Sequence, residues 1–352
     1  MAMTRVTHGL RWLRRHAHVH IVLPVIVAVG LLAYVASLAS TPRAAHALGV
    51  ATRQVWWIVL LLTIPYLAAR AYVWNDLMRE LGIKTPFRRL LLAFADGEMS
   101  KSLPAGVYVQ NYLLKRLSHL DKERTVRSTV ATTAILGLES ALALAVVLIV
   151  GIPGAAWVRG GLIAVVVIWL VLIAAGWLLI RRELHTRATL PTWFRTALSA
   201  VEDFLTDGGA LLRWRTLTNI GPTALYMGVY AVDLFVILQA LGLHLGWAAI
   251  ITVYAAMVLA VVLIPIPTEI GIAEISALGA LEAFGVPHHT AAAVSLALRI
   301  LATGSTILLA GLAFLALRGK LKKAADEQAN GAAQGAHGAA TTAGHERLLD
   351  QL

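Results

Sequence analysis

The residues of this sequence that are most able to do chemistry are ionisable side chains inside segments otherwise apolar enough to lie in a lipid bilayer. The set comprises Asp96, Glu98, Lys101, Glu139, Asp233, Glu269, Glu274, Glu282 and Arg299. A charge at the centre of a bilayer costs about 2.5 to 3.5 kcal/mol on insertion scales, so such residues usually face a cavity and pair with one another. We therefore expect them to surround a polar site within the membrane.

Arg299 stands in an Ala-rich segment, where a guanidinium is costly unless it is paired. It can hold a phosphate through two parallel hydrogen bonds, as binding of a lipid phosphodiester would require. The structural alternative is an ion pair with Glu139 or Glu274 that holds the two halves of the chain together. A pair that opens to admit phosphate would combine both roles and act as a gate.

The other candidates also have a functional and a structural interpretation. Glu98 and Lys101 are three residues apart, so on a helix they share a face and form either a structural ion pair or part of the site. Glu269 and Glu274 would either bind a polar ligand or accept N–H groups at the start of a helix. Asp233 would be either a proton or ion site or a polar residue packed against another helix.

Two apolar segments, one in each half of the chain, are interrupted by helix-breaking residues. Pro104 and Gly106 interrupt the first, and Pro267 and Gly271 interrupt the second. Such backbone persists at membrane depth only where protein or a wet cavity surrounds it. Broken helices in corresponding places of two halves indicate the binding site of a membrane transporter.

The composition excludes a soluble globular protein. Hydrophobic residues make up 59% of the chain, charged residues make up 14%, and the mean hydropathy is +0.74. The formal charge of +11 comes from basic clusters beside apolar segments, which favours contact with anionic lipid heads over nucleic-acid binding. Cysteine is absent, and no Gly-rich phosphate loop or Ser/His/Asp constellation occurs, so we expect no metal, no cofactor and no catalytic residue.

The predicted fold class is an all-α polytopic membrane protein with about six full spans. These spans are residues 20–39, 52–72, 128–151, 161–180, 218–241 and 290–317. The positive-inside rule places both termini in the cytoplasm. It also makes 88–116 a broken or re-entrant helical hairpin from the cytoplasm and 248–285 one from the outside, in an inverted-repeat arrangement.

The predicted domain organisation is a single integral-membrane domain over residues 1–317. Its pseudo-repeats cover about 52–151 and 218–317, and an interfacial cytoplasmic helix covers about 191–215. Residues 318–352 are basic and then rich in Ala, Gly and Gln, which predicts a disordered cytoplasmic tail.

Two stretches carry a resemblance to a known family. The first is Glu98-Met-Ser-Lys-Ser-Leu-Pro-Ala-Gly106, followed by Asn111-Tyr-Leu-Leu-Lys-Arg116, and the second is Ile266-Pro-Thr-Glu-Ile-Gly-Ile-Ala-Glu274, followed by Phe284-Gly-Val-Pro287, Ala291 and Arg299. They resemble the motifs of the lysylphosphatidylglycerol synthase transmembrane, or flippase-like, family over roughly residues 20–317. The chain departs from the pattern at 107–111 and at Ser140, where the family places charged residues.

The resemblance implies a multi-pass protein of the bacterial inner membrane that moves a lipid head group between leaflets. The separate synthase domain of fused members is absent from this sequence, so we expect no enzyme activity. The expected cargo is a phospholipid, glycolipid or isoprenoid-linked lipid. The expected protein partners are a lipid-biosynthesis enzyme or a second copy of the chain.

Two other functions remain open on the sequence. One is a membrane-embedded transferase that acts on a lipid phosphate, which commonly needs acidic residues in an aqueous loop. The other is a non-transporting scaffold of a lipid-biosynthesis complex, which leaves the cost of Glu274 and Arg299 in the membrane unexplained.

Overall fold

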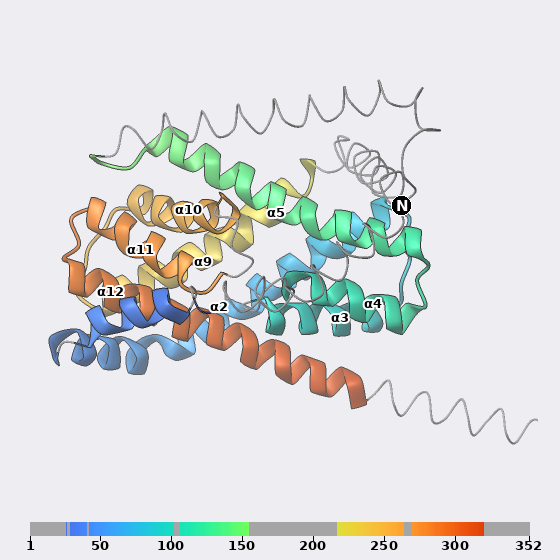
Figure 1. Ribbon diagram of the computed structural model, residues 1–352, viewed down its shortest axis with the longest axis horizontal. Helices are drawn as coiled ribbons and strands as arrows, with labels where there is room; N and C mark the ends of the chain where they lie inside the picture. Colours follow the sequence, from blue (N-terminus) through green and yellow to red (C-terminus); the bar gives the residue numbers. More distant parts are fainter. Residues whose placement is uncertain are drawn as a thin grey trace, which may run out of the picture.

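The described part of the protein consists of helices joined by short turns (Figure 1). The computed structural model describes residues 26, 29–40, 42–101, 106–154, 217–263 and 269–319, and no strand occurs in these ranges. The predicted all-α class is therefore confirmed. The predicted span at 161–180, the interfacial helix at 191–215, the tail, and both Pro104 and Pro267 lie outside the described residues.

Within the described ranges, four helices are long and apolar enough to cross a membrane. They are Thr52–Glu80 within α2 (Pro42–Glu80), α5 (Lys122–Val150), α9 (Ile220–Ala240) and the continuous helix His288–Gly319. This last helix, called here the long terminal helix, contains α12 (His288–Leu298), the π-helical turn η3 (Arg299–Thr303) and a further α-helical part. The four agree with predicted spans, and Val29–Ala39 is the described part of another.

Each interrupted segment forms a pair of short helices instead of one continuous span. The first pair is α3 (Phe87–Ser100) and α4 (Val109–Ser118), joined through the 3₁₀ turn η1 (Gly106–Tyr108). The second is α10 (Trp247–Leu263) and α11 (Ile272–Ala283). With 14 residues α3 is about 21 Å long, which is shorter than the hydrocarbon core of roughly 30 Å.

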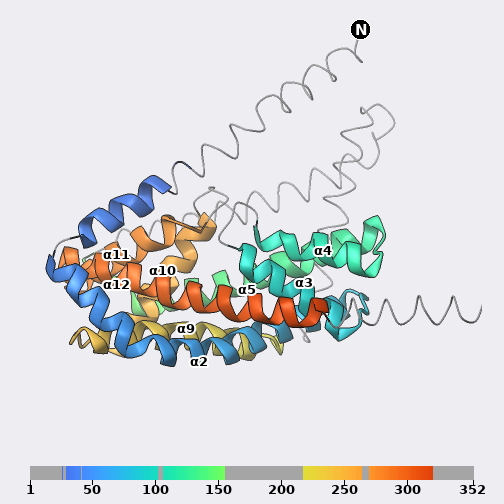
Figure 2. The same ribbon diagram turned by 90° about the horizontal axis from the view of Figure 1, so that it is seen from below.

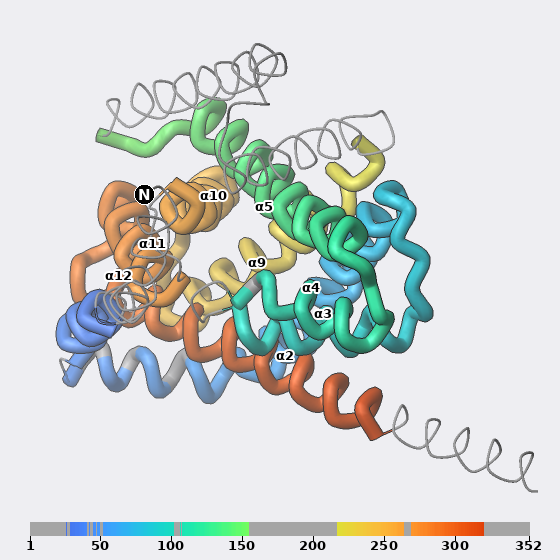
Figure 3. The backbone as a smooth tube through the Cα atoms, turned by 45° about the vertical axis from the view of Figure 1, so that its right-hand side comes forward, coloured from blue at the N-terminus to red at the C-terminus, as the bar shows by residue number. Residues whose placement is uncertain are grey.

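The two hairpins lie at opposite ends of the bundle, with α3 and α4 at one end and α10 and α11 at the other (Figure 1). In both halves the hairpin precedes a long helix, which is α5 in the first half and the long terminal helix in the second. Figure 3 shows α5 crossing the bundle from one hairpin to the other.

Helices α2 and α9 lie side by side and run in opposite directions (Figure 2). Asn219 near the start of α9 donates to Asp76 near the end of α2, with an Nδ2–Oδ2 distance of 2.9 Å. Further along, Tyr66 contacts the rings of Tyr226 and Tyr230. Two apolar clusters are built on this helix pair, one toward each hairpin, and Tyr230 packs against both.

Two glycines allow the close packing of the first hairpin. A Cβ atom on Gly97 would lie 2.6 Å from Oε1 of Gln110, so α3 and α4 approach each other closely at this point. A Cβ atom on Gly106 would lie 1.6 Å from the backbone oxygen of Ser100. The position of this Cβ atom is fixed by the backbone of residue 106, and the atom it would meet is also backbone. No side-chain movement can therefore relieve the clash.

We predict that Gly106→Ala lowers the free energy of unfolding by about 3 kcal/mol, the upper end of the usual cost of overpacking. The measurement is unfolding in mixed micelles followed by circular dichroism. Gly137→Ala is the matched control, because nothing lies within 4 Å of a Cβ atom at that helical position. Equal stability of the two variants would contradict the observed turn.

Candidate functional site

Arg70 on α2 joins three helices through its guanidinium group. Its Nε lies 2.8 Å from Oε1 of Glu98 on α3, and its Nη1 lies 2.7 Å from Oε1 of Glu139 on α5. All three side chains are buried: the exposed fraction is 9% for Arg70, 3% for Glu98 and 9% for Glu139. Helices α2, α3 and α5 are therefore fixed against one another by a single cation.

Lys101 and two tyrosines complete this first cluster. Nζ of Lys101 lies 3.3 Å from Oε2 of Glu98, as the spacing of three predicted, and donates to the hydroxyl of Tyr66 at 2.8 Å. The hydroxyl of Tyr226 donates to Oε1 of Glu139 at 2.8 Å. The first cluster thus balances two cations against two carboxylates within a shell of hydroxyl groups.

Arg299 forms the centre of a second cluster in the other half of the chain. Its Nε donates to Oε1 of Glu274, while Nη2 donates to the backbone oxygen of Glu269 at 3.1 Å. Its Nη1 donates to Oγ1 of Thr303 at 3.3 Å. Arg299 is the first residue of the π-helical turn η3, a geometry frequent at functional sites.

Glu274 has two functions in this cluster. One oxygen accepts from Arg299, and the other accepts the backbone N–H of Gly271 at 2.6 Å, which caps the start of α11. Gly271 has φ 84°, a left-handed conformation that glycine adopts without the cost of a Cβ atom. The two structural interpretations of Glu274, as a partner of Arg299 and as a helix cap, are therefore present together.

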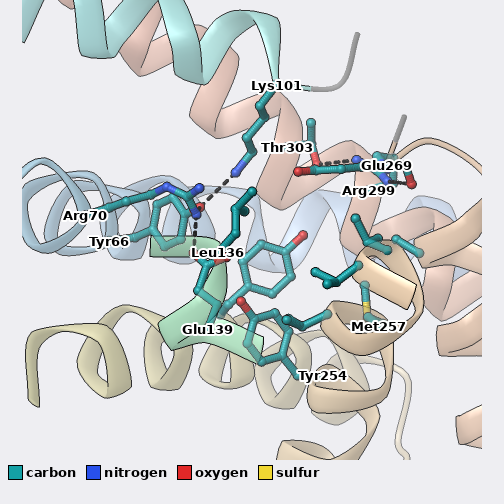
Figure 4. Close-up of a pocket in the computed structure, with 15 residues that line it drawn as sticks. Tyr66, Arg70, Lys101, Leu136, Glu139, Tyr254, Met257, Glu269, Arg299 and Thr303 are labelled. Atoms are coloured by element: carbon teal, nitrogen blue, oxygen red, sulfur yellow. Dashed lines mark hydrogen bonds and ion pairs between the residues drawn. The ribbon is translucent and has the colours of Figure 1, made fainter. Parts of the chain in front are cut away.

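The two clusters border one cavity of about 90 Å³. Figure 4 shows Lys101 reaching toward Tyr66 and Arg70 on one side of it, with Arg299, Glu269 and Thr303 on the other. Between them, Tyr230 and Tyr254 stack with ring centroids 4.9 Å apart. The remaining wall is apolar and comes mostly from α10, with Met257 as one of its residues.

The cavity gathers most of the predicted site residues. Lys101, Glu139, Glu269 and Arg299 line it directly. Glu98 and Glu274 lie next to it as partners of lining cations, and Gly106 and Gly271 form the turns beside it.

Three ionisable candidates lie away from this cavity. Asp233 is buried on α9, and its Oδ1 accepts no hydrogen bond from the described residues. Glu282 pairs with His288 at the turn between α11 and α12. Asp96 is half-buried on α3.

Arg70 is the residue that the sequence interpretation missed. The suggested pairing of Arg299 with Glu139 is wrong, because Arg70 binds Glu139 and Arg299 binds Glu274. Arg70 falls near the end of the predicted span 52–72 and is not among the ionisable candidates named from the sequence. The available signal was the spacing of Tyr66 and Arg70, which places both on one face of a helix.

The fold and the site define a polytopic helical membrane protein with a charged cavity to which both broken hairpins contribute residues. The sequence pattern of the family described as the lysylphosphatidylglycerol synthase TM region matches residues 21–311. The chain therefore belongs to this family of membrane domains. No curated protein and no solved structure matches it significantly.

We predict that Arg70→Met lowers the free energy of unfolding by about 3 to 5 kcal/mol, because it leaves two buried carboxylates without their cation. The triple variant Arg70→Met, Glu98→Gln, Glu139→Gln should recover most of this loss. Unfolding in mixed micelles measures both.

The control for this series is Arg79→Met, at the exposed end of the same helix, which should change stability by no more than about 0.5 kcal/mol. If Arg70→Met is as stable as this control, the guanidinium does not hold the three helices together.

Proposed function

We propose that this protein is a transporter, not an enzyme, and that it moves a lipid head group between the leaflets of the membrane. The observation that carries the proposal is the meeting of ionisable residues from both hairpins at one small cavity, with Lys101 from the first hairpin and Glu269 from the second. Charges at membrane depth are costly, and they usually mark the pathway of a polar substrate. Membership of a family of lipid-related membrane domains supports the same function.

The cations at the cavity suit the phosphate of a lipid. Arg299 offers a planar fork of N–H donors, and Lys101 offers an ammonium group on the opposite side. Glu139 and Glu269 suit a cationic or hydroxylated part of the head group. Counted as ionised, the cations Arg70, Lys101 and Arg299 face the carboxylates Glu98, Glu139, Glu269 and Glu274, so the site favours a head group that is not purely anionic.

The size of the cavity requires a conformational change before a lipid can bind. The cavity measures about 90 Å³. Pockets for small molecules commonly measure about 300 to 1,000 Å³. We infer that the structure is a closed state and that movement of a helix beside the cavity widens it.

An exchange of ion-pair partners lowers the free-energy cost of this opening. If Arg299 turns from Glu274 to a lipid phosphate, the guanidinium keeps an anionic partner. Glu274 keeps the N–H of Gly271 and does not become an isolated buried charge. Glu98 is held in the same way by two cations, Arg70 and Lys101, so one of them can leave while the other stays.

The proposed location is the bacterial inner membrane with both termini in the cytoplasm. This orientation follows from the positive-inside rule, and the basic loops would then contact anionic lipid heads. A lipid-biosynthesis enzyme or a second copy of the chain is the proposed protein partner.

We predict that Arg299→Gln and Glu274→Gln each slow lipid translocation by about tenfold to a hundredfold. The loss corresponds to about 1.5 to 3 kcal/mol for a hydrogen bond to a charged group. Proteoliposomes that contain phosphatidylglycerol or phosphatidylethanolamine with a fluorescent acyl chain report translocation through quenching by dithionite.

The control is Arg318→Gln, at the exposed end of the long terminal helix, which should translocate at the wild-type rate. Insertion and monodispersity of every variant are checked by size-exclusion chromatography. Wild-type rates in both cavity variants would refute the proposal.

A further inference from the structure

A second cavity lies beside the charged one and is almost entirely apolar. It measures about 380 Å³ and lies between α2, α3 and the last part of the long terminal helix. Alanines form much of its wall, namely Ala68, Ala71, Ala95, Ala310 and Ala313. Small side chains usually let helices pack closely, but here they leave a groove, called the alanine groove below.

On α3 the alanine groove and the first charged cluster occupy one helical face. Phe87, Leu91 and Phe94 line the groove, and Glu98 and Lys101 follow at steps of three or four residues. Side chains at this spacing lie above one another along a helix. This face of α3 is therefore apolar toward its start and charged at its end.

The long terminal helix repeats this arrangement. Arg299 and Thr303 line the charged cavity, and Ala310 and Ala313 line the alanine groove. Thr303, Ala310 and Ala313 are again spaced for one helical face. From Arg299 to Ala313 the helix rises about 21 Å, the same as from Lys101 back to Phe87. The two helices thus offer matching faces that are charged at one end and apolar at the other.

Two exposed aromatic side chains border the alanine groove. Tyr72 is 56% exposed on α2, which is apolar and long enough to cross a membrane, and Phe87 is 60% exposed at the start of α3. Asn75 and the hydroxyl of Tyr72 supply the polar side-chain atoms among its lining residues. An apolar void of this kind stays free of water and accepts apolar molecules.

We propose that the alanine groove binds an alkyl chain of the same lipid whose head group enters the charged cavity. This inference rests on the proposed transport function and adds the position of the lipid tail. Lipid tails in the bilayer are as apolar as the groove, so binding gains nothing from the removal of water. The gain comes from filling a void whose walls otherwise lack contacts.

The experiment uses the full-length protein in nanodiscs with phosphatidylglycerol or phosphatidylethanolamine that carries a diazirine on one acyl chain. After illumination, mass spectrometry compares the label on residues 87–95 and 310–313 with the label around Ile149. That residue is 79% exposed on α5 and reports ordinary lipid contact. We expect several-fold more label in the alanine groove than around Ile149.

Two variants fill the groove from different walls, namely Ala313→Trp on the long terminal helix and Ala68→Trp on α2. Each should lower labelling of the groove by roughly tenfold, since a large ring takes the space that the chain needs. The matched controls are Leu312→Trp and Ile64→Trp, at positions 56% and 53% exposed on the same helices. Both controls should label like the wild type.

Equal labelling of the alanine groove and of the surroundings of Ile149, or unchanged labelling in both filling variants, would overturn the proposal. In Arg299→Gln, labelling of the groove should fall, and labelling at the wild-type level would show that head and tail sites belong to different lipids. Failure of the wild-type protein to translocate lipid in vesicles would instead refute the transport function. The labelling result and the translocation result are therefore separable.

Discussion

The bridge that Arg70 forms between Glu98 and Glu139 is the interaction on which the rest of the site depends. A buried charge without a partner costs several kcal/mol, so these groups can stay in the interior only together. Because they come from three helices, their pairing fixes the first hairpin against both α2 and α5. It also sets the position of Lys101, at the end of α3, on the wall of the charged cavity. The same bridge therefore stabilises this half of the protein and positions Lys101 as a candidate ligand group.

In the second half of the chain, fewer charged groups hold one another in the interior. Glu274 binds Arg299 and caps α11 through Gly271, so the carboxylate remains hydrogen-bonded whichever way the guanidinium turns. The first cluster is more heavily cross-linked, because Arg70 and Lys101 share Glu98 and Arg70 also binds Glu139. This difference suggests that the second hairpin, and not the first, responds to a phosphate at the cavity. The volume of about 90 Å³ is consistent with a closed state from which such a movement would begin.

The sequence predicts the parts of this site that have a local signal. Pro and Gly mark both helix breaks, and the spacing of Glu98 and Lys101 predicts their ion pair. The cost of charge in a bilayer selects Glu274 and Arg299. The partner of Glu139 could not be found in this way, because Arg70 is 69 residues away and no periodicity relates the two positions. The tyrosines of the cavity carry no charge, so no energetic penalty distinguishes them from core residues. The alanine groove likewise depends on how three helices meet, which composition does not specify.

An experimental structure of the protein in nanodiscs made from the lipids of its host cell tests the central claim most directly. The account predicts a lipid phosphate within hydrogen-bonding distance of Arg299, a widened cavity, and Glu274 bound to Gly271 but released from the guanidinium. Lipid density confined to the outer surface, with the Arg299–Glu274 pair intact in every particle class, would contradict it.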